Sequence, residues 1–364
     1  MRLKNILALL VMAIFVASAA VAQEAAAPVK EEKPKASVSG VLFFDYSYLM
    51  SYEEKVADVE EKGQDSINLQ RVYVTFANKI DDVWSVKVTL DGGTGENGDV
   101  FIKNAYFQMA QKFDPVGLKI QAGVVGTPIV GLLDKLGGQR WIYNNYGADA
   151  TTDITGKKFD VSSADTGIKA DIDIMKMVTI TGMYSNADGY KKKTQDQDAV
   201  TKAYYSVINI TPIKPLNIFG YYHWHDTAGA SDENYASYMG GGLAWSDKAI
   251  KIGGSYSIYS GKAADVKEEG TVLSFWLNVN LQQFAGMPVL LIGRYAMGTY
   301  EKKVTGAKLE NEGSTIWAGI GYQANSNVQF ALMYNTGALE KKSAGVKDSD
   351  AEASTIYLKS EVKF

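Results

Sequence analysis

From Val38 to Phe364 the sequence alternates apolar and polar residues in one short segment after another. In one example the apolar residues occupy every second position: Val328, Phe330, Leu332 and Tyr334. Because successive side chains of a β-strand point to opposite faces, this pattern predicts strands with one apolar and one polar face. We count sixteen such segments, at 38–49, 66–79, 82–91, 101–110, 116–125, 165–173, 177–185, 200–210, 215–225, 236–246, 249–259, 270–280, 288–299, 313–324, 327–337 and 353–364. The chain is therefore predicted to be all-β.

The connections between these segments alternate between short and long. Short turns are expected near 79–82, 174–176, 211–214, 246–248 and 325–326. Long polar loops are expected near 50–65, 92–100, 126–164, 186–199, 226–235, 260–269, 300–312 and 338–352. An even number of strands, with short turns on one rim and long loops on the other, is typical of bacterial membrane barrels.

A soluble β-sandwich or propeller would also contain short alternating strands. Most segments here have about 10 residues, however, which suits a tilted membrane strand better than the usual soluble strand of about 5 or 6. We therefore predict a 16-stranded antiparallel transmembrane β-barrel with a long third loop.

The N-terminus reads as a targeting segment. Arg2 and Lys4 precede an uncharged apolar run that ends in Ala20-Val21-Ala22, as in a secretory signal peptide with an A-x-A cleavage site. A membrane anchor is the alternative, but the run is short for a span of about 20 residues. We expect a signal peptide at 1–22, a flexible periplasmic leader at 23–37 and the barrel at 38–364.

Composition excludes several kinds of chemistry. The chain has no Cys and only two His, and its formal charge is −4, so thiol catalysis, Cys-zinc sites and electrostatically driven nucleic-acid binding are not expected. His223 and His225 lie two apart and should share one strand face, but a third metal ligand is not evident. No phosphate-binding loop or catalytic motif is present. We predict no enzyme activity, no cofactor, no metal site and no nucleic-acid partner.

The alternation also predicts which charges line the lumen, because a charge on the lipid face costs about 2–4 kcal/mol at mid-membrane. The basic residues predicted inside are Arg71, Lys87, Lys119, Lys169, Lys251, Arg294 and Lys359, and the acidic ones are Asp45, Asp171 and Glu361. A wall richer in cations would favour anions. Alternatively, the charges pair with one another and leave weak selectivity, and the sequence leaves both possibilities open.

The third loop has a helical pattern at its start. Thr127 is a candidate N-cap, Pro128 suits the first helical position, apolar residues come next, and Gly137-Gly138 would end the helix. A connection of about 39 residues is normally functional or disordered.

Several features of the sequence resemble those of known protein families. A C-terminal strand ending in Phe364 looks like an outer-membrane assembly signal, and the signal peptide, sixteen strands and long third loop look like general porins. More narrowly, Ile102–Val130, preceded by Arg71, is similar to the phosphate-selective porins O and P. The matching positions are Asn104, Ala105, Tyr106, Lys119, Gly123, Thr127 and Pro128.

This resemblance implies a third loop folded into the lumen as a constriction; a surface flap is the alternative. Its candidates at the narrow point are Asp134, Lys135 and Arg140, with Tyr143, Asn144 and Asn145. The resemblance also implies a homotrimer and recognition of the C-terminal strand by the barrel-assembly machinery.

We therefore predict a porin of the bacterial outer membrane, surrounded by its lipid. It would let small hydrophilic solutes and ions diffuse passively, with a preference for anions if the cations of the wall are not neutralised by pairing. The alternative is a structural or adhesive barrel without significant channel activity.

Overall fold

The computed structural model describes residues 35–93, 99–143, 161–187, 189–190, 201–226, 234–304 and 307–364. The predicted signal peptide and nearly all of the predicted leader lie outside the described residues, as do Asn144 and Asn145. The first strand begins at Lys35, three residues before the predicted start of the barrel at Val38.

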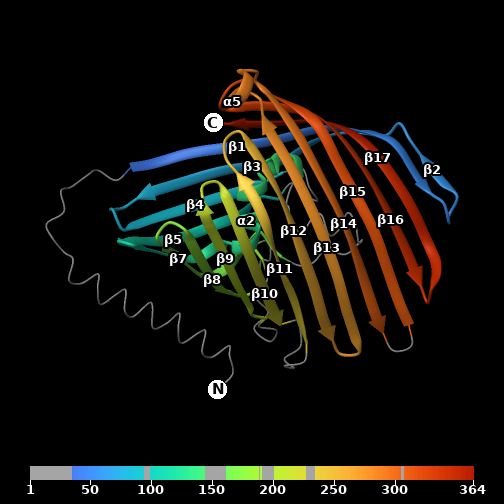
Figure 1. Ribbon diagram of the computed structural model, residues 1–364, viewed down its shortest axis with the longest axis horizontal. Coiled ribbons are helices and arrows are strands. Elements are labelled where there is room, and N and C mark those ends of the chain that lie inside the picture. Colours follow the sequence, from blue (N-terminus) through green and yellow to red (C-terminus); the bar gives the residue numbers. More distant parts are fainter. Residues whose placement is uncertain are drawn as a thin grey trace.

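Strands make up most of the described chain (Figure 1). They are β1 Lys35–Glu54, β2 Val59–Glu61, β3 Asp65–Lys79, β4 Trp84–Gly92, β5 Phe101–Phe113, β6 Val116–Gly126, β7 Ala164–Ile174, β8 Val178–Ser185, β9 Ala203–Ile213, β10 Leu216–Asp226, β11 Tyr235–Ser246, β12 Ile250–Ala263, β13 Val266–Asn280, β14 Val289–Val304, β15 Ala307–Gln323, β16 Val328–Ser343 and β17 Val346–Lys363. The helices include α2 Pro128–Gly137, α3 Arg140–Tyr143 and α5 Gln282–Ala285. Within the described part of the chain, every helix is too short or too polar to cross a membrane.

The strands close into a barrel. Each strand from β3 to β16 pairs antiparallel with the next one along the chain, and β1 pairs with both β3 and β17. At this seam Gly40 and Phe364 exchange two backbone hydrogen bonds, of 2.7 and 3.0 Å. The short strand β2 pairs only with the end of β1 and extends the hairpin beyond the rim (Figure 1). The predicted closed barrel of sixteen strands is thus confirmed.

The barrel has two chemically distinct faces. Large apolar side chains on the outer face are exposed, such as Ile320 and Leu332, each 60% accessible. The inner face of the barrel carries buried polar and charged side chains, including Asp45, Arg294 and Lys359. An apolar exterior around a polar interior is the arrangement that a lipid bilayer requires of a barrel.

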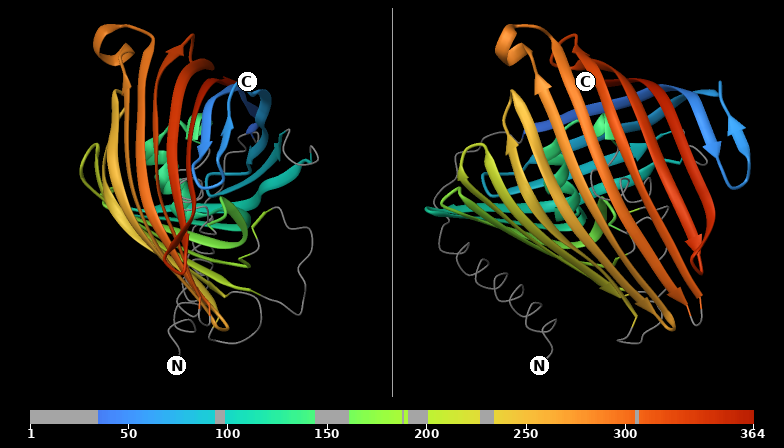
Figure 2. Two further views of the ribbon diagram at one scale, coloured as in Figure 1. Left: turned by 90° about the vertical axis from the view of Figure 1, so that its right-hand side faces the viewer. Right: turned by 45° about the vertical axis from the view of Figure 1, so that its right-hand side comes forward.

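The prediction of long loops at 260–269, 300–312 and 338–352 is wrong. Strands β12 to β17 continue through these segments and meet in tight hairpins, as Figure 2 shows for the longest strands. The segments carry Lys and Glu on the outward positions, and these form ion pairs such as Lys308–Glu301 at 2.9 Å and Lys347–Glu340 at 2.7 Å. A strand without an apolar face has no period-two hydropathy signal, so the sequence pattern misses it.

Candidate functional site

The third long connection begins with the predicted helix. Pro128 is the first residue of α2, and the helix ends at Gly137. Gly138 comes next with φ of 67°, a left-handed conformation that suits glycine. One detail is wrong: the Thr127 hydroxyl does not cap the helix but donates to the backbone carbonyl of Ser162. Thr127 thereby ties the start of the connection to its end.

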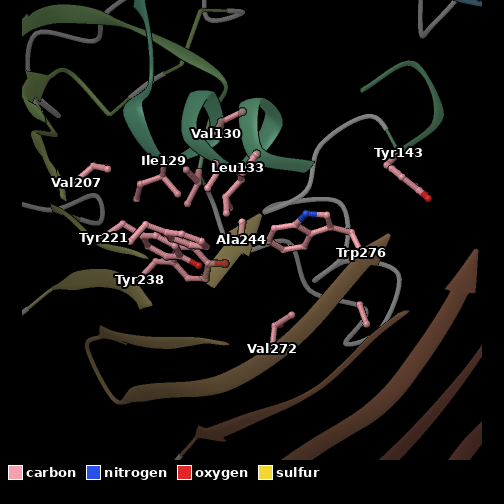
Figure 3. Close-up of a cluster of buried hydrophobic side chains, with 14 of the residues drawn as sticks. Ile129, Val130, Leu133, Tyr143, Val207, Tyr221, Tyr238, Ala244, Val272 and Trp276 are labelled. Carbon is pink, nitrogen blue, oxygen red and sulfur yellow. The ribbon is translucent and has the colours of Figure 1, made fainter. Parts of the chain in front are cut away.

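Helix α2 packs against the inner face of the wall (Figure 2). Ile129, Leu133 and Leu136 are fully buried. Figure 3 shows the first two, with Val130, above aromatic side chains of the strands. The wall residues of this cluster include Val207, Tyr221, Tyr238, Ala244 and Trp276. Apolar burial therefore holds α2 against β9 to β13, and one side of the lumen is filled.

Three inward side chains, two lysines and one amide, hold the backbone of this connection. Lys251 Nζ donates to the Lys135 carbonyl at 2.9 Å, and Asn278 Nδ2 donates to the Gly137 carbonyl at 2.7 Å. Lys169 Nζ donates to the Gly126 carbonyl at 2.9 Å. The side chain of Lys135 itself is exposed. Lys169 and Lys251 thus lie on the inner face, where each donates a hydrogen bond to the backbone of this connection.

On the opposite wall several donors converge on one carboxylate. Asp91 Oδ2 accepts from Arg71 at 3.0 Å, from Lys103 at 3.4 Å and from the Tyr190 hydroxyl at 2.7 Å. Lys103 also donates to the Tyr73 hydroxyl at 2.6 Å. Burial beside the Asp91 carboxylate raises the pKa of Tyr190 to about 12, so its hydroxyl remains a donor. We call Arg71, Tyr73, Asp91, Lys103 and Tyr190 the Asp91 cluster.

Helix α3 brings a further cation toward this cluster. Arg140 forms an ion pair with Asp134 of α2, and its charge also acts on Arg71 and Lys103. Its Nε is buried and has no hydrogen-bond partner among the residues that the structure describes. At the end of α3, Tyr143 is buried beneath the Arg294 guanidinium, whose Cζ lies 5.4 Å from the ring centroid.

The remaining predicted lumen residues also lie on the inner face. Lys359 pairs with Asp45 at 3.3 Å, and both are buried. Lys119 pairs with Asp171 at 2.5 Å. Lys87 lies on the inner face of β4, with Lys169 within electrostatic reach. The structure therefore brings Arg71, Arg294 and Lys359 close to α3 and its Arg140, whereas Lys87, Lys119 and Lys169 form a separate group.

Sequence reasoning missed Lys103. Counting by twos from Asn104 and Tyr106 puts Lys103 on the lipid face, but a register shift between Thr89 and Leu90 turns it inward. Such a bulge inserts one residue and reverses the face on which the next side chains lie. Further acids, Asp91, Asp165 and Glu268, also form inner-face hydrogen bonds, so the predicted excess of seven cations over three acids is too large.

His223 and His225 share the inner face, as predicted, and their rings stack 5.0 Å apart, with Tyr205 stacked on His223 at 4.3 Å. Among the residues that the structure describes, three or more His, Asp or Glu side chains nowhere gather as a metal site would require.

No protein-family model matches the chain, and no curated protein matches its sequence. Solved structures match it along nearly its whole length. OmpT of Vibrio cholerae in its trimer form, folded in vitro, has 11% identity and a TM-score of 0.64 over 92% of this chain and 100% of that one. The outer membrane channel DcaP of Acinetobacter baumannii has 11% identity and a TM-score of 0.63 over 92% and 99%. The anion-selective porin from Comamonas acidovorans has 12% identity and a TM-score of 0.62 over 91% and 100%.

This chain has the fold of outer-membrane porins. The bacterial outer membrane is the location of that fold, and an apolar outer face agrees with it. At these identities the likeness establishes the architecture alone. It does not confirm the narrower resemblance to the phosphate-selective porins O and P.

Proposed function

We propose that the chain is a porin through which small hydrophilic solutes and ions diffuse passively. The observation that carries this proposal is the lining: a closed barrel with charged side chains on its inner face and α2 packed along one side only. A barrel of about sixteen strands is too wide for side chains to fill, so water occupies the rest of the lumen. In this proposal α2 and α3 narrow the passage.

We also propose a preference for anions, which rests on the charges around α3. Among the described residues these are five cations and three carboxylates: Arg71, Lys103, Arg140, Arg294, Lys359, Asp45, Asp91 and Asp134. A net positive constriction lowers the barrier for anions and raises it for cations. The Comamonas acidovorans porin of similar fold is named as anion-selective. The resemblance of residues 102–130 to the O and P porins makes phosphate one candidate anion.

Two assembly properties belong to the same proposal. The chain would form homotrimers, as the similar Vibrio cholerae OmpT structure does in its trimer form. The C-terminal strand would be recognised by the barrel-assembly machinery, and its last residue lies at the seam where the barrel closes. That the chain is not an enzyme stays a prediction.

The deciding experiment is the single-channel conductance of the refolded protein in a planar bilayer, with the zero-current potential measured under a KCl gradient. We expect stable conductance steps and a potential whose sign shows anion preference. Silence from correctly folded barrels would contradict the proposal and favour a structural or adhesive role.

Charge reversal then tests which cations control selectivity. Arg71→Glu should move the zero-current potential toward cation preference, because it changes the charge beside α3 by two units. Lys87→Glu is the matched control on the neighbouring strand, and it should have a smaller effect because Lys87 belongs to the separate group near Lys169. Equal shifts of the zero-current potential for both variants would show that the Asp91 cluster does not control ion selectivity.

A further inference from the structure

Aromatic side chains gather at α3 and on the strands that face it. The rings of Trp317 and Tyr357 stack with centroids 5.2 Å apart, and Tyr143 meets Trp317 edge-on at 5.9 Å. Phe43 and Tyr73 form a second edge-on pair at 5.9 Å. We call these five residues the aromatic wall. They come from β15, β17, α3, β1 and β3, so the fold gathers them from both ends of the sequence.

A cation lies against a ring in both parts of this wall. Lys359 Nζ is 4.7 Å from the Tyr357 centroid and 5.6 Å from that of Trp317, and Lys103 Nζ is 4.4 Å from that of Tyr73. The two lysines are buried, with 4% and 7% of their surface accessible, whereas Tyr73, Trp317 and Tyr357 are only half-buried. A solute therefore meets the rings and hydroxyls first and the positive charges behind them.

The aromatic residues of the other side of the lumen differ in their accessibility. Tyr221, Tyr238 and Trp276 are buried in the cluster beneath α2, where they serve packing (Figure 3). In the aromatic wall, Phe43 and Tyr143 are also buried members of the apolar cluster, whereas Tyr73, Trp317 and Tyr357 are at its half-buried margin. Packing of α2 thus explains the rings beneath it but not the three half-buried rings of the aromatic wall.

A ring with a cation on one side is electron-poor, since the cation draws on the negative charge of the ring face. Such a ring stacks well with an electron-rich ring, and the nearby ammonium and guanidinium groups attract a carboxylate. An inorganic anion or an aliphatic acid gains only the second interaction. A planar aromatic carboxylate gains both.

We propose that the aromatic wall is a binding site for organic anions that carry a planar ring, with aromatic carboxylates as the solute class. This inference rests on the proposed porin function and adds a substrate class to it. The wall would hold such solutes briefly during passage and so distinguish them from aliphatic acids of equal charge.

The test uses three sodium salts added to refolded channels in a planar bilayer: benzoate, cyclohexanecarboxylate and acetate. Benzoate should interrupt the KCl current at a concentration about two- to tenfold lower than cyclohexanecarboxylate, which has the same charge and a similar size but no planar ring. Equal potency of these two salts would overturn the proposal. Absence of any channel in KCl would instead overturn the porin function itself.

Two variants locate the effect. Trp317→Leu and, separately, Tyr357→Leu should remove most of the preference for benzoate while leaving a KCl conductance, which also shows that the variant has folded. Tyr334→Leu is the control, because Tyr334 is an exposed aromatic residue of the outer face. A benzoate preference that survives both inner-face variants, or is lost in Tyr334→Leu, would contradict the assignment.

Discussion

Asp91 is the carboxylate to which two cations near α3, Arg71 and Lys103, both donate. Its Oδ2 atom accepts from Arg71, Lys103 and Tyr190, so in the proposed channel this carboxylate would compete with a permeating anion for these donors. Removal of its charge should strengthen anion preference. A unit charge at 4 Å contributes about 1 kcal/mol in water and acts with opposite sign on anions and cations, so we expect Asp91→Asn to raise the anion-to-cation permeability ratio about thirtyfold. Zero-current potentials under a KCl gradient measure this ratio.

The control is Asp173→Asn, which removes an exposed inner-face carboxylate that pairs with Thr179 away from the Asp91 cluster. It should change the ratio less than Asp91→Asn does. A permeability ratio that is unchanged or lower in Asp91→Asn would show that the cluster lies outside the path of the ions.

Single residues also show where sequence reasoning stops. Arg71, Arg294 and Lys359 could be placed on the inner face from alternation alone, since their strands carry a clear apolar face. Lys103 could not, because a bulge in the β4–β5 pairing reverses its face, and a bulge leaves no mark in the hydropathy pattern. The partners of each charge depend on contacts between distant strands and likewise need the structure.

At the scale of elements, strands with an apolar face and helix α2 were predictable. The pattern Thr127-Pro128 with Gly137-Gly138 at the far end indicated the bounds of α2, because local propensities set both ends. Its packing against β9 to β13 was expected only by resemblance. The ends of β12 to β17 were missed, because cross-strand ion pairs rather than an apolar face stabilise them.

The docking of α2 gives a prediction at this scale. Leu133→Ala should destabilise the folded protein by about 2–5 kcal/mol, because Leu133 is buried between α2 and the wall and its truncation leaves a cavity. Urea denaturation in detergent measures this loss. We also expect noisier open-channel currents, since a loosened α2 moves in the lumen. Leu132→Ala, at the half-buried neighbouring position, should lower the free energy of unfolding by less. An equal loss in the two variants would show that this apolar face does not hold α2.

At the scale of the whole molecule, the barrel exists only when its first and last strands meet. β1 and β17 pair from Val41 and Lys363 to Glu54 and Ala351, and Phe364 adds two backbone hydrogen bonds to Gly40. The ring of Phe364 is exposed on the outside, where it lies over Gly40. Phe364 therefore has two separable parts, a backbone that completes the seam and a ring that is exposed on the outer face.

Two variants separate these parts. Deletion of Phe364 removes two hydrogen bonds, worth about 1–3 kcal/mol together, and should lower the folded fraction both in cells and on refolding in detergent. Phe364→Ala keeps the backbone pairing, so it should refold in detergent almost as well as the unaltered chain. In cells less of this variant should assemble, because in our proposal the assembly machinery recognises the Phe364 ring. Heat-modifiable mobility on gels reports the folded fraction in each case. Phe113→Ala, at another exposed ring, controls for the loss of an aromatic side chain; normal assembly of Phe364→Ala in cells would mean that the last residue acts through barrel closure alone.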